Sequence, residues 1–102
     1  MKHLKVYLSP LAEQKLLTLL EFLEHKSGIN AKNKFIAKFE RSVELISKFP
    51  KSSVEIEEFK GVRKCFVSKQ TSFFYRINEE DIEIITVSDN RQNPDAILRE
   101  IS

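Results

Sequence analysis

The sequence predicts an α+β domain: a β-α-α-β-β-β chain whose antiparallel sheet is covered on one face by a helical hairpin, and which ends in a short helix. Before Pro50, apolar residues recur at spacings of three and four, as one face of a helix requires. After Pro50, the segments are short and rich in β-branched and aromatic residues, which is typical of strands. Because 102 residues without a linker or repeat form one domain, residues 1–102 are expected to fold together.

Local signals mark the first strand and the two long helices. Residues 3–8 alternate as a strand does, and Ser9-Pro10 follows as an N-cap and a first helical residue. The first helix ends near Gly28, where a positive φ is favourable. The second helix ends before Pro50, because the residue before a proline disfavours the helical conformation. Two long helices with a short connection pack as an antiparallel hairpin.

Later strands are predicted over residues 54–59, 62–69, 72–78 and 82–88. The short gaps between the last three segments have hairpin spacing. Apolar residues lie on both faces of the last two segments: Phe73, Tyr75 and Ile77 opposite Phe74, and Ile82 and Ile84 opposite Ile85 and Val87. Since the helical hairpin covers one face alone, we expect either the terminal helix or a partner protein to cover the other.

Composition excludes several classes of function. Cys65 is the only cysteine, so no disulfide framework or CxxC metal pair exists, and a reducing compartment, the cytoplasm, is expected. No apolar leader or membrane-length segment is present, which predicts no membrane partner. His3 and His25 each stand alone, and two glycines cannot build a phosphate-binding loop. We therefore expect neither a metal nor a cofactor.

Charge is distributed unevenly along the chain. Residues 60–76 contain five basic residues and no acidic one, whereas acidic residues flank this segment. The basic residues are Lys60, Arg63, Lys64, Lys69 and Arg76. A local basic surface on a chain of formal net charge +2 suggests an anionic partner at one place. The alternative is an ordinary solvated face of the sheet.

A run of polar residues, Asp89 to Asn93, follows the last predicted strand. Asn93-Pro94-Asp95 is explained as the N-cap and first turn of a terminal helix over residues 94–101. Asp89, Arg91 and Gln92 have no such explanation. A guanidinium stays charged and can hold a carboxylate or phosphate through two parallel hydrogen bonds, so Arg91 is a candidate binding residue. The alternative is a solvated loop arginine.

These pieces together resemble the RelE/ParE superfamily of bacterial type II toxins. The order is a strand, a helical hairpin, a proline, GVRK (61–64), FFYRI (73–77), IEIITV (82–87) and DNRQNP (89–94). The resemblance spans nearly the whole chain. It implies a growth-inhibiting toxin that a cognate antitoxin neutralises. The partly disordered antitoxin is expected to lay a strand or amphipathic helix on the uncovered apolar face and to bring acidic side chains to residues 60–76.

The superfamily divides by target. RelE-like members cleave messenger RNA on the ribosome, and their pattern places basic residues at Lys69 and Arg91 of this chain. A further arginine and an aromatic acid or base of that pattern fall at Ser72 and Ile97, so two roles are vacant. ParE-like members share the scaffold without that set and act by binding, which implies DNA gyrase as the target.

The ParE-like interpretation is therefore favoured, with an RNA-cleaving enzyme or an inert toxin-fold domain as alternatives. Tyr75 is not an obvious catalytic substitute, because it lies in the middle of an apolar strand. Candidate residues for binding the target or antitoxin are Arg63, Lys64, Lys69, Arg76, Arg91 and Gln92.

Overall fold

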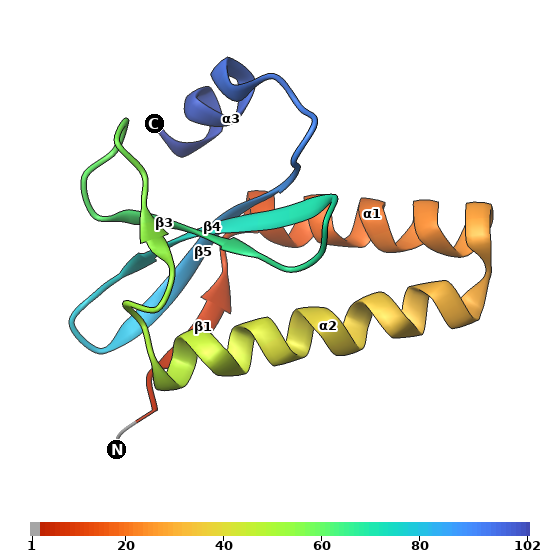
Figure 1. Cartoon of the computed structure of the whole chain (residues 1–102), viewed down its shortest axis with the longest axis horizontal. Helices are drawn as coiled ribbons and strands as arrows, with labels where there is room; N and C mark the ends of the chain where they lie inside the picture. The colour runs from red at the N-terminus through yellow and green to blue at the C-terminus, as the bar shows by residue number, and fades with distance from the viewer. Residues whose placement is uncertain (1–2) are drawn as a thin grey trace.

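A computed structural model describes residues 3–102, so residues 1 and 2 of the predicted domain lie outside the described part. Five strands form one sheet in the order β1-β5-β4-β3-β2, and α1 and α2 extend past it (Figure 1). The elements are β1 (Lys5–Leu8), α1 (Pro10–Ser27), α2 (Ile29–Lys48), β2 (Val54–Glu55), β3 (Val62–Phe66), β4 (Thr71–Ile77), β5 (Asp81–Asp89) and α3 (Pro94–Ile101). The predicted α+β fold is confirmed, and the short β2 lies at one edge of the five-stranded sheet.

The direction of β1 differs from the prediction. β2 to β5 pair antiparallel as expected, whereas β1 runs parallel to β5, with Lys5 opposite Asp81 and Leu8 opposite Ile84. The sheet is therefore mixed. A parallel pair needs a long connection, and here the helical hairpin and three strands separate β1 from β5. No local turn signal in the sequence reveals such a pairing.

The segment 54–59, predicted as one strand, is a strand only over β2. After Glu55 the chain turns, because the Ile56 N–H donates to the Val62 carbonyl (2.9 Å) and the Gly61 N–H donates to the Glu55 carboxylate (2.7 Å). Gly61 has a φ of +87°, which residues with a Cβ rarely adopt. The turn ends β2 early and returns the chain into β3.

The strand predicted over 62–69 also ends early, at Phe66. The Val67 N–H donates to the Thr71 carbonyl (2.9 Å) and closes the connection between β3 and β4. The prediction for this boundary is wrong, because apolar Val67 lies at the start of the turn instead of continuing the strand. As a consequence Lys69 lies in the turn itself, at the end of the sheet.

A β-bulge in β5 changes which way its side chains point. The pairs on either side of the bulge are Phe74 with Thr86 and Tyr75 with Ile84. Ile85 is the extra residue, and it packs beneath α3, whereas Val87 packs into the core beneath the helical hairpin. The prediction that Val87 shares a face with Ile85 is wrong, because the extra residue shifts the alternation of the strand by one position.

The main core lies between the helical hairpin and the sheet. The rings of Phe39 in α2 and Phe73 in β4 lie 5.5 Å apart, and the Phe73 and Tyr75 rings lie 5.9 Å apart. Other buried members are Ala12, Phe35, Ile46, Cys65, Ile82, Ile84 and Val87. Within residues 3–102, no helix is long and apolar enough to cross a membrane.

The N-terminal end of α1 is joined to the bulge by Ser9. Its hydroxyl accepts the Ala12 N–H (3.0 Å) as a helix cap and donates to the Ile85 carbonyl (2.7 Å). The Ser9 N–H donates to the Ile84 carbonyl (2.9 Å). One buried side chain therefore caps α1 and satisfies a carbonyl of the extra residue in β5.

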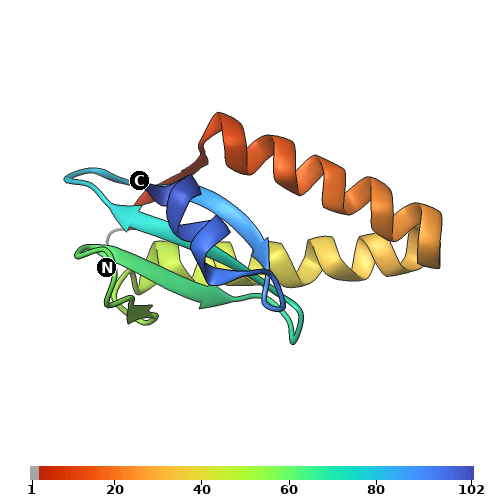
Figure 2. The same cartoon turned by 90° about the horizontal axis from the view of Figure 1, so that it is seen from above.

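The terminal helix covers the opposite face of the sheet (Figure 2). Ile97 and Ile101 pack there against Val62, Phe74 and Ile85. Glu100 accepts hydrogen bonds from the buried Thr86 hydroxyl (2.7 Å) and from Lys15 of α1 (2.7 Å). Of the two covers considered from the sequence, the terminal helix is the one observed.

Replacing Ser9 with alanine tests the link between α1 and the bulge. The substitution removes the helix cap and leaves the buried Ile85 carbonyl without this donor, so we expect a loss of about 1–2 kcal/mol in the free energy of unfolding. Urea denaturation measures it. Ser27→Ala, at the exposed end of the same helix, is the control and should change stability by less than about 0.5 kcal/mol. Equal effects of the two substitutions would contradict the proposed link.

Candidate functional site

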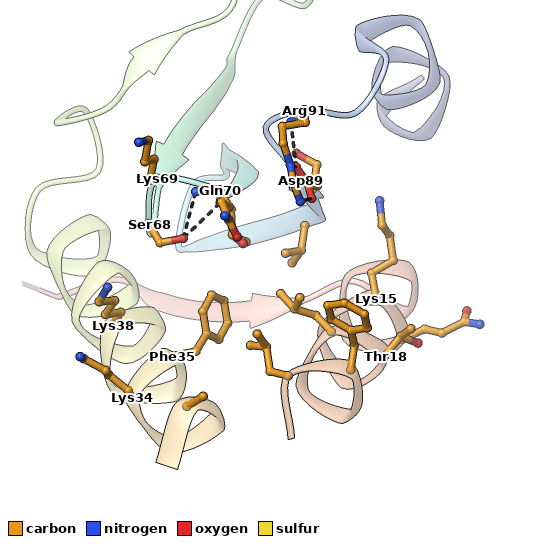
Figure 3. A pocket seen from close by; sticks show the side chains of 18 of the residues that line it. Lys15, Thr18, Lys34, Phe35, Lys38, Ser68, Lys69, Gln70, Asp89 and Arg91 are labelled. Atoms are coloured by element: carbon orange, nitrogen blue, oxygen red, sulfur yellow. Dashed lines mark hydrogen bonds and ion pairs between the residues drawn. The ribbon is translucent and has the colours of Figure 1, made fainter. Parts of the chain in front are cut away.

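A cleft of about 880 Å³ lies between the helical hairpin and the end of the sheet that carries the β3–β4 turn (Figure 3). We call it the hairpin cleft. Its apolar surface comes from Leu11, Leu19, Phe22, Leu23, Ala31, Phe35 and Val87. Phe35 is nearly buried, whereas Phe22 is 55% exposed. An exposed aromatic ring beside a concave apolar surface indicates a binding surface for another molecule.

Basic side chains surround this apolar surface. They are Lys15 of α1, Lys34 and Lys38 of α2, Lys69 of the β3–β4 turn and Arg91 after β5. Lys15 is paired with Glu100, and Arg91 is paired with Asp89, both at 2.7 Å. Within residues 3–102, the other three lysines form no ion pair. The hairpin cleft therefore combines apolar contact area with a net positive rim, which suits an acidic amphipathic partner.

Arg91 is held by Asp89 through both its backbone and its guanidinium. Asp89 accepts the Arg91 backbone N–H (2.8 Å), Nε (3.0 Å) and Nη2 (2.7 Å). These hydrogen bonds lower the pKa of the Asp89 carboxyl to about 2, and the carboxylate raises the pKa of the Arg91 guanidinium. The Arg91 side chain remains 73% exposed at the rim of the hairpin cleft, so the orientation of the guanidinium is set without burial of the side chain.

Asn90 is a site residue that the sequence analysis did not identify. Its side chain donates to the Lys69 carbonyl (3.0 Å) and accepts the Ser72 hydroxyl (2.6 Å). Its backbone N–H donates to the Gln70 carbonyl (2.7 Å). Asn90 thus fastens the loop of Arg91 to the turn of Lys69. The sequence does show that Asn90 is an amide residue at the end of a strand. The partners of Asn90 depend on strand register, however, which the sequence does not show.

The structure places Lys69 and Arg91 in the lining of the same hairpin cleft and places Lys64 and Gln92 in a second depression. This depression has a volume of about 170 Å³ and lies at the edge of α3. The Lys64 ammonium lies 4.9 Å from the centre of the Phe66 ring. The Gln92 N–H donates to the Asp89 carbonyl (2.9 Å). The part that Lys64 and Gln92 play in binding stays a prediction.

Arg63 and Arg76 lie away from the hairpin cleft. Arg63 donates to the Ser53 carbonyl (2.7 Å), and its side chain is 18% exposed, so it secures the segment before β2. Arg76 lies beside Glu83, with 3.9 Å between the charged atoms. The single basic surface expected over residues 60–76 is therefore divided. Successive side chains of a strand point to opposite faces, so a basic run in sequence does not make a basic patch.

Ser72 and Ile97, the two positions where the nuclease pattern has no matching catalytic residue, are both buried in the fold. Ser72 is fully buried and donates its hydroxyl to Asn90, and Ile97 is a buried residue of α3. Tyr75 is also fully buried, and its hydroxyl donates to the Pro50 carbonyl (2.6 Å). Burial raises the pKa of the Tyr75 hydroxyl, which makes it a weaker proton donor. Each of these side chains has a structural explanation.

Several solved structures share the fold of this chain, although their sequences are only 12 to 15% identical to it. The chromosomal ParDE toxin–antitoxin system of P. aeruginosa matches with a TM-score of 0.72 and 15% identity, over 85% of this chain and 96% of that chain. The YoeB dimer of Staphylococcus aureus matches with a TM-score of 0.58 and 12% identity, over 84% and 95%. A conserved hypothetical protein of Helicobacter pylori gives 0.56 and 15%, over 87% and 97%. The fold is therefore that of the ParE- and RelE-like toxins.

The family follows from the sequence itself. The family model of the ParE toxin of the type II toxin–antitoxin system parDE matches residues 6–94. This match spans most of the chain, so the chain belongs to the ParE toxin family, and the resemblance to the RelE/ParE superfamily is confirmed. No curated protein matches the sequence. The matched residues include the loop that carries Arg91, whereas most of α3 lies beyond them.

Replacing Asn90 with alanine tests whether this residue fastens the Arg91 loop to the Lys69 turn. The substitution leaves the Ser72 hydroxyl and the Lys69 carbonyl without this partner, so we expect a loss of about 1–2 kcal/mol in stability. Amide hydrogen exchange at position 90, corrected for residue type, should also accelerate, because the backbone N–H at this position donates to the Gln70 carbonyl in the turn. Asn93→Ala is the control: it removes only the cap of α3, at a cost of about 1 kcal/mol, and should leave exchange at Asn90 unchanged. Unchanged exchange in Asn90→Ala would contradict the assignment.

Proposed function

We propose that this ParE-family toxin arrests bacterial growth in the cytoplasm by binding DNA gyrase, without catalysing a reaction, and that a cognate antitoxin neutralises it. The observation that carries the proposal is the occupation of both nuclease positions by structural residues. Cleavage of RNA by its own 2′-OH needs a proton acceptor, a proton donor and cations that stabilise the charged transition state. The Ser72 hydroxyl donates its hydrogen bond to the Asn90 side chain, and Ile97 has no group that could transfer a proton.

A second candidate function, ribosome-dependent cleavage of messenger RNA, is favoured by one observation. Lys69 and Arg91 both line the hairpin cleft, where the nuclease branch would need two of its cations. These residues can stabilise a phosphate, but an ammonium and a guanidinium are hydrogen-bond donors only and have no acceptor atom. Two cations of a nuclease site are therefore present in the hairpin cleft. The residues at the other two positions of the nuclease pattern, Ser72 and Ile97, do not supply groups for proton transfer.

The antitoxin is proposed to occupy the hairpin cleft. The earlier expectation placed it on the apolar face opposite the helical hairpin, but α3 already covers that face. An amphipathic helix or strand could instead bury apolar residues on Phe22 and Leu19 and bring carboxylates to Lys34 and Lys38. Because salt screens charge but not apolar burial, raised salt should weaken this complex without abolishing it.

Growth measurements test the toxin function and Arg91 together. Expression of the chain alone should arrest bacterial growth, and co-expression of the small protein encoded beside it should restore growth. Arg91→Ala should abolish arrest while the melting temperature persists, because the guanidinium is exposed and is proposed to contact the target. Arg91→Lys should restore arrest only in part, since an ammonium keeps the charge but loses the planar pair of donors. Asn93→Ala is the control that should leave arrest in place.

Normal growth at high expression of folded protein would instead support the inert toxin-fold domain. A toxic and normally folded Arg91→Ala variant would show that Arg91 is a loop residue without a role in the target complex. Melting curves of the purified variants separate a loss of toxicity from a loss of fold.

Purified protein distinguishes the two candidate targets. A binding toxin should block DNA supercoiling by gyrase and leave ribosome-bound messenger RNA intact, because Ser72 and Ile97 supply no catalytic groups. Supercoiling gels and primer extension on a translating extract measure the two activities, with Arg91→Ala as the control in both. Cleavage at defined codon positions, lost in Arg91→Ala, would reverse the order of the two candidates.

A further inference from the structure

Asp89 places a carboxylate directly against Arg91, an exposed cation at the rim of the hairpin cleft. Its two oxygens receive the backbone N–H, Nε and Nη2 of Arg91, at 2.7 to 3.0 Å. Nε and Nη2 form the edge of a guanidinium that binds a carboxylate or phosphate through parallel hydrogen bonds. We propose that Asp89 is an internal counter-ion that masks this edge of Arg91 and so keeps the hairpin cleft from binding nucleic acid.

The Asp89–Arg91 ion pair is expected to mask the guanidinium of Arg91 and to contribute little to the stability of the fold. Both side chains are exposed, at 73% for Arg91 and 45% for Asp89, and exposed ion pairs contribute little to folding stability. An incoming phosphate must either displace the Asp89 carboxylate or bind the other edge of the Arg91 guanidinium. In the second case the phosphate lies close to the carboxylate, which is also negatively charged. Each route weakens the attraction that the guanidinium alone would exert.

The remaining charges of the cleft show why this one carboxylate matters. Lys34, Lys38 and Lys69 line the cleft without an ion pair among residues 3–102, and Figure 3 shows all three on one side of it, apart from Arg91. Binding of single-stranded nucleic acid without sequence preference depends mainly on such cations. A protein partner also gains apolar contact with Phe22 and Leu19, which Asp89 does not oppose. Asp89 therefore acts against polyanions more than against an amphipathic protein.

The test compares Asp89→Asn with the unaltered protein, using a fluorescent single-stranded oligouridylate and anisotropy at low salt. Asparagine keeps an oxygen that can accept the Arg91 N–H but removes the charge. The affinity for the oligonucleotide should rise by about fivefold or more, and it should fall more steeply with added salt. Asp95→Asn is the matched control: it removes the same charge from an exposed acidic residue in the first turn of α3, outside the cleft, and should raise affinity less than about twofold.

A second comparison separates masking of Arg91 from a general gain of positive charge. In an Arg91→Ala background, Asp89→Asn should raise affinity no more than Asp95→Asn does, because nothing remains to be unmasked. Asp89→Ser repeats the test if the asparagine variant melts at a lower temperature. The proposal fails if Asp89→Asn binds no RNA, gains no more than Asp95→Asn, or gains equally without Arg91. None of these outcomes depends on whether gyrase is the target.

Discussion

The extra residue in β5 determines how the helices and the hairpin cleft are arranged around the sheet. Without the bulge at Ile85, Val87 would point away from the helical hairpin, and the hairpin cleft would lose the part of its apolar surface that comes from β5. The bulge also leaves the Ile85 carbonyl free for Ser9, which caps α1. Beside the bulge, the Thr86 hydroxyl donates to Glu100 of α3. One irregularity therefore connects the sheet to both of its helical covers.

Asn90 holds the exposed loop that follows β5 in a fixed position. It ties the residues after β5 to the β3–β4 turn, so Arg91 and Lys69 line one cleft although they belong to different connections. Asp89 then orients the guanidinium through three contacts. Loops usually move more than the elements they connect, but this loop is held at successive residues. A preorganised cation loses less conformational entropy on binding than a free arginine side chain would.

The sequence predicted the elements well because their signals are local. Ser9-Pro10, Gly28 and Pro50 bound the two long helices through backbone preferences that act within a few residues. The parallel pairing of β1, the bulge at Ile85 and the partners of Asn90 depend on strand register instead. Register is set by packing between residues far apart in the chain, so no local pattern records it.

The same distinction holds for the candidate site. Arg91 was selected because no cap or turn explains it and, above all, because the resemblance to the superfamily assigns an arginine to that position; the structure places it at the rim of the hairpin cleft. Lys34 and Lys38 gave no signal, because lysines on a helix are most often solvated. Arg63 lies in the basic run of the sequence but away from the hairpin cleft, where its guanidinium donates to backbone carbonyls of the chain itself, and its role in binding stays a prediction. Strand alternation, and not the density of charge in the sequence, decides which cations meet.

Ser72 connects the scaffold to the proposed mode of action. A small hydroxyl at this buried position is what allows Asn90 to reach between β4 and the β3–β4 turn. An arginine at position 72 would remove the hydroxyl that donates to Asn90 and would place a long charged side chain at a fully buried position of β4. The contact that fastens the Arg91 loop is therefore made by a side chain that cannot also be the second arginine of a nuclease. The proposed binding function agrees with this arrangement, because the cluster of cations that phosphodiester chemistry requires would need a longer side chain at position 72.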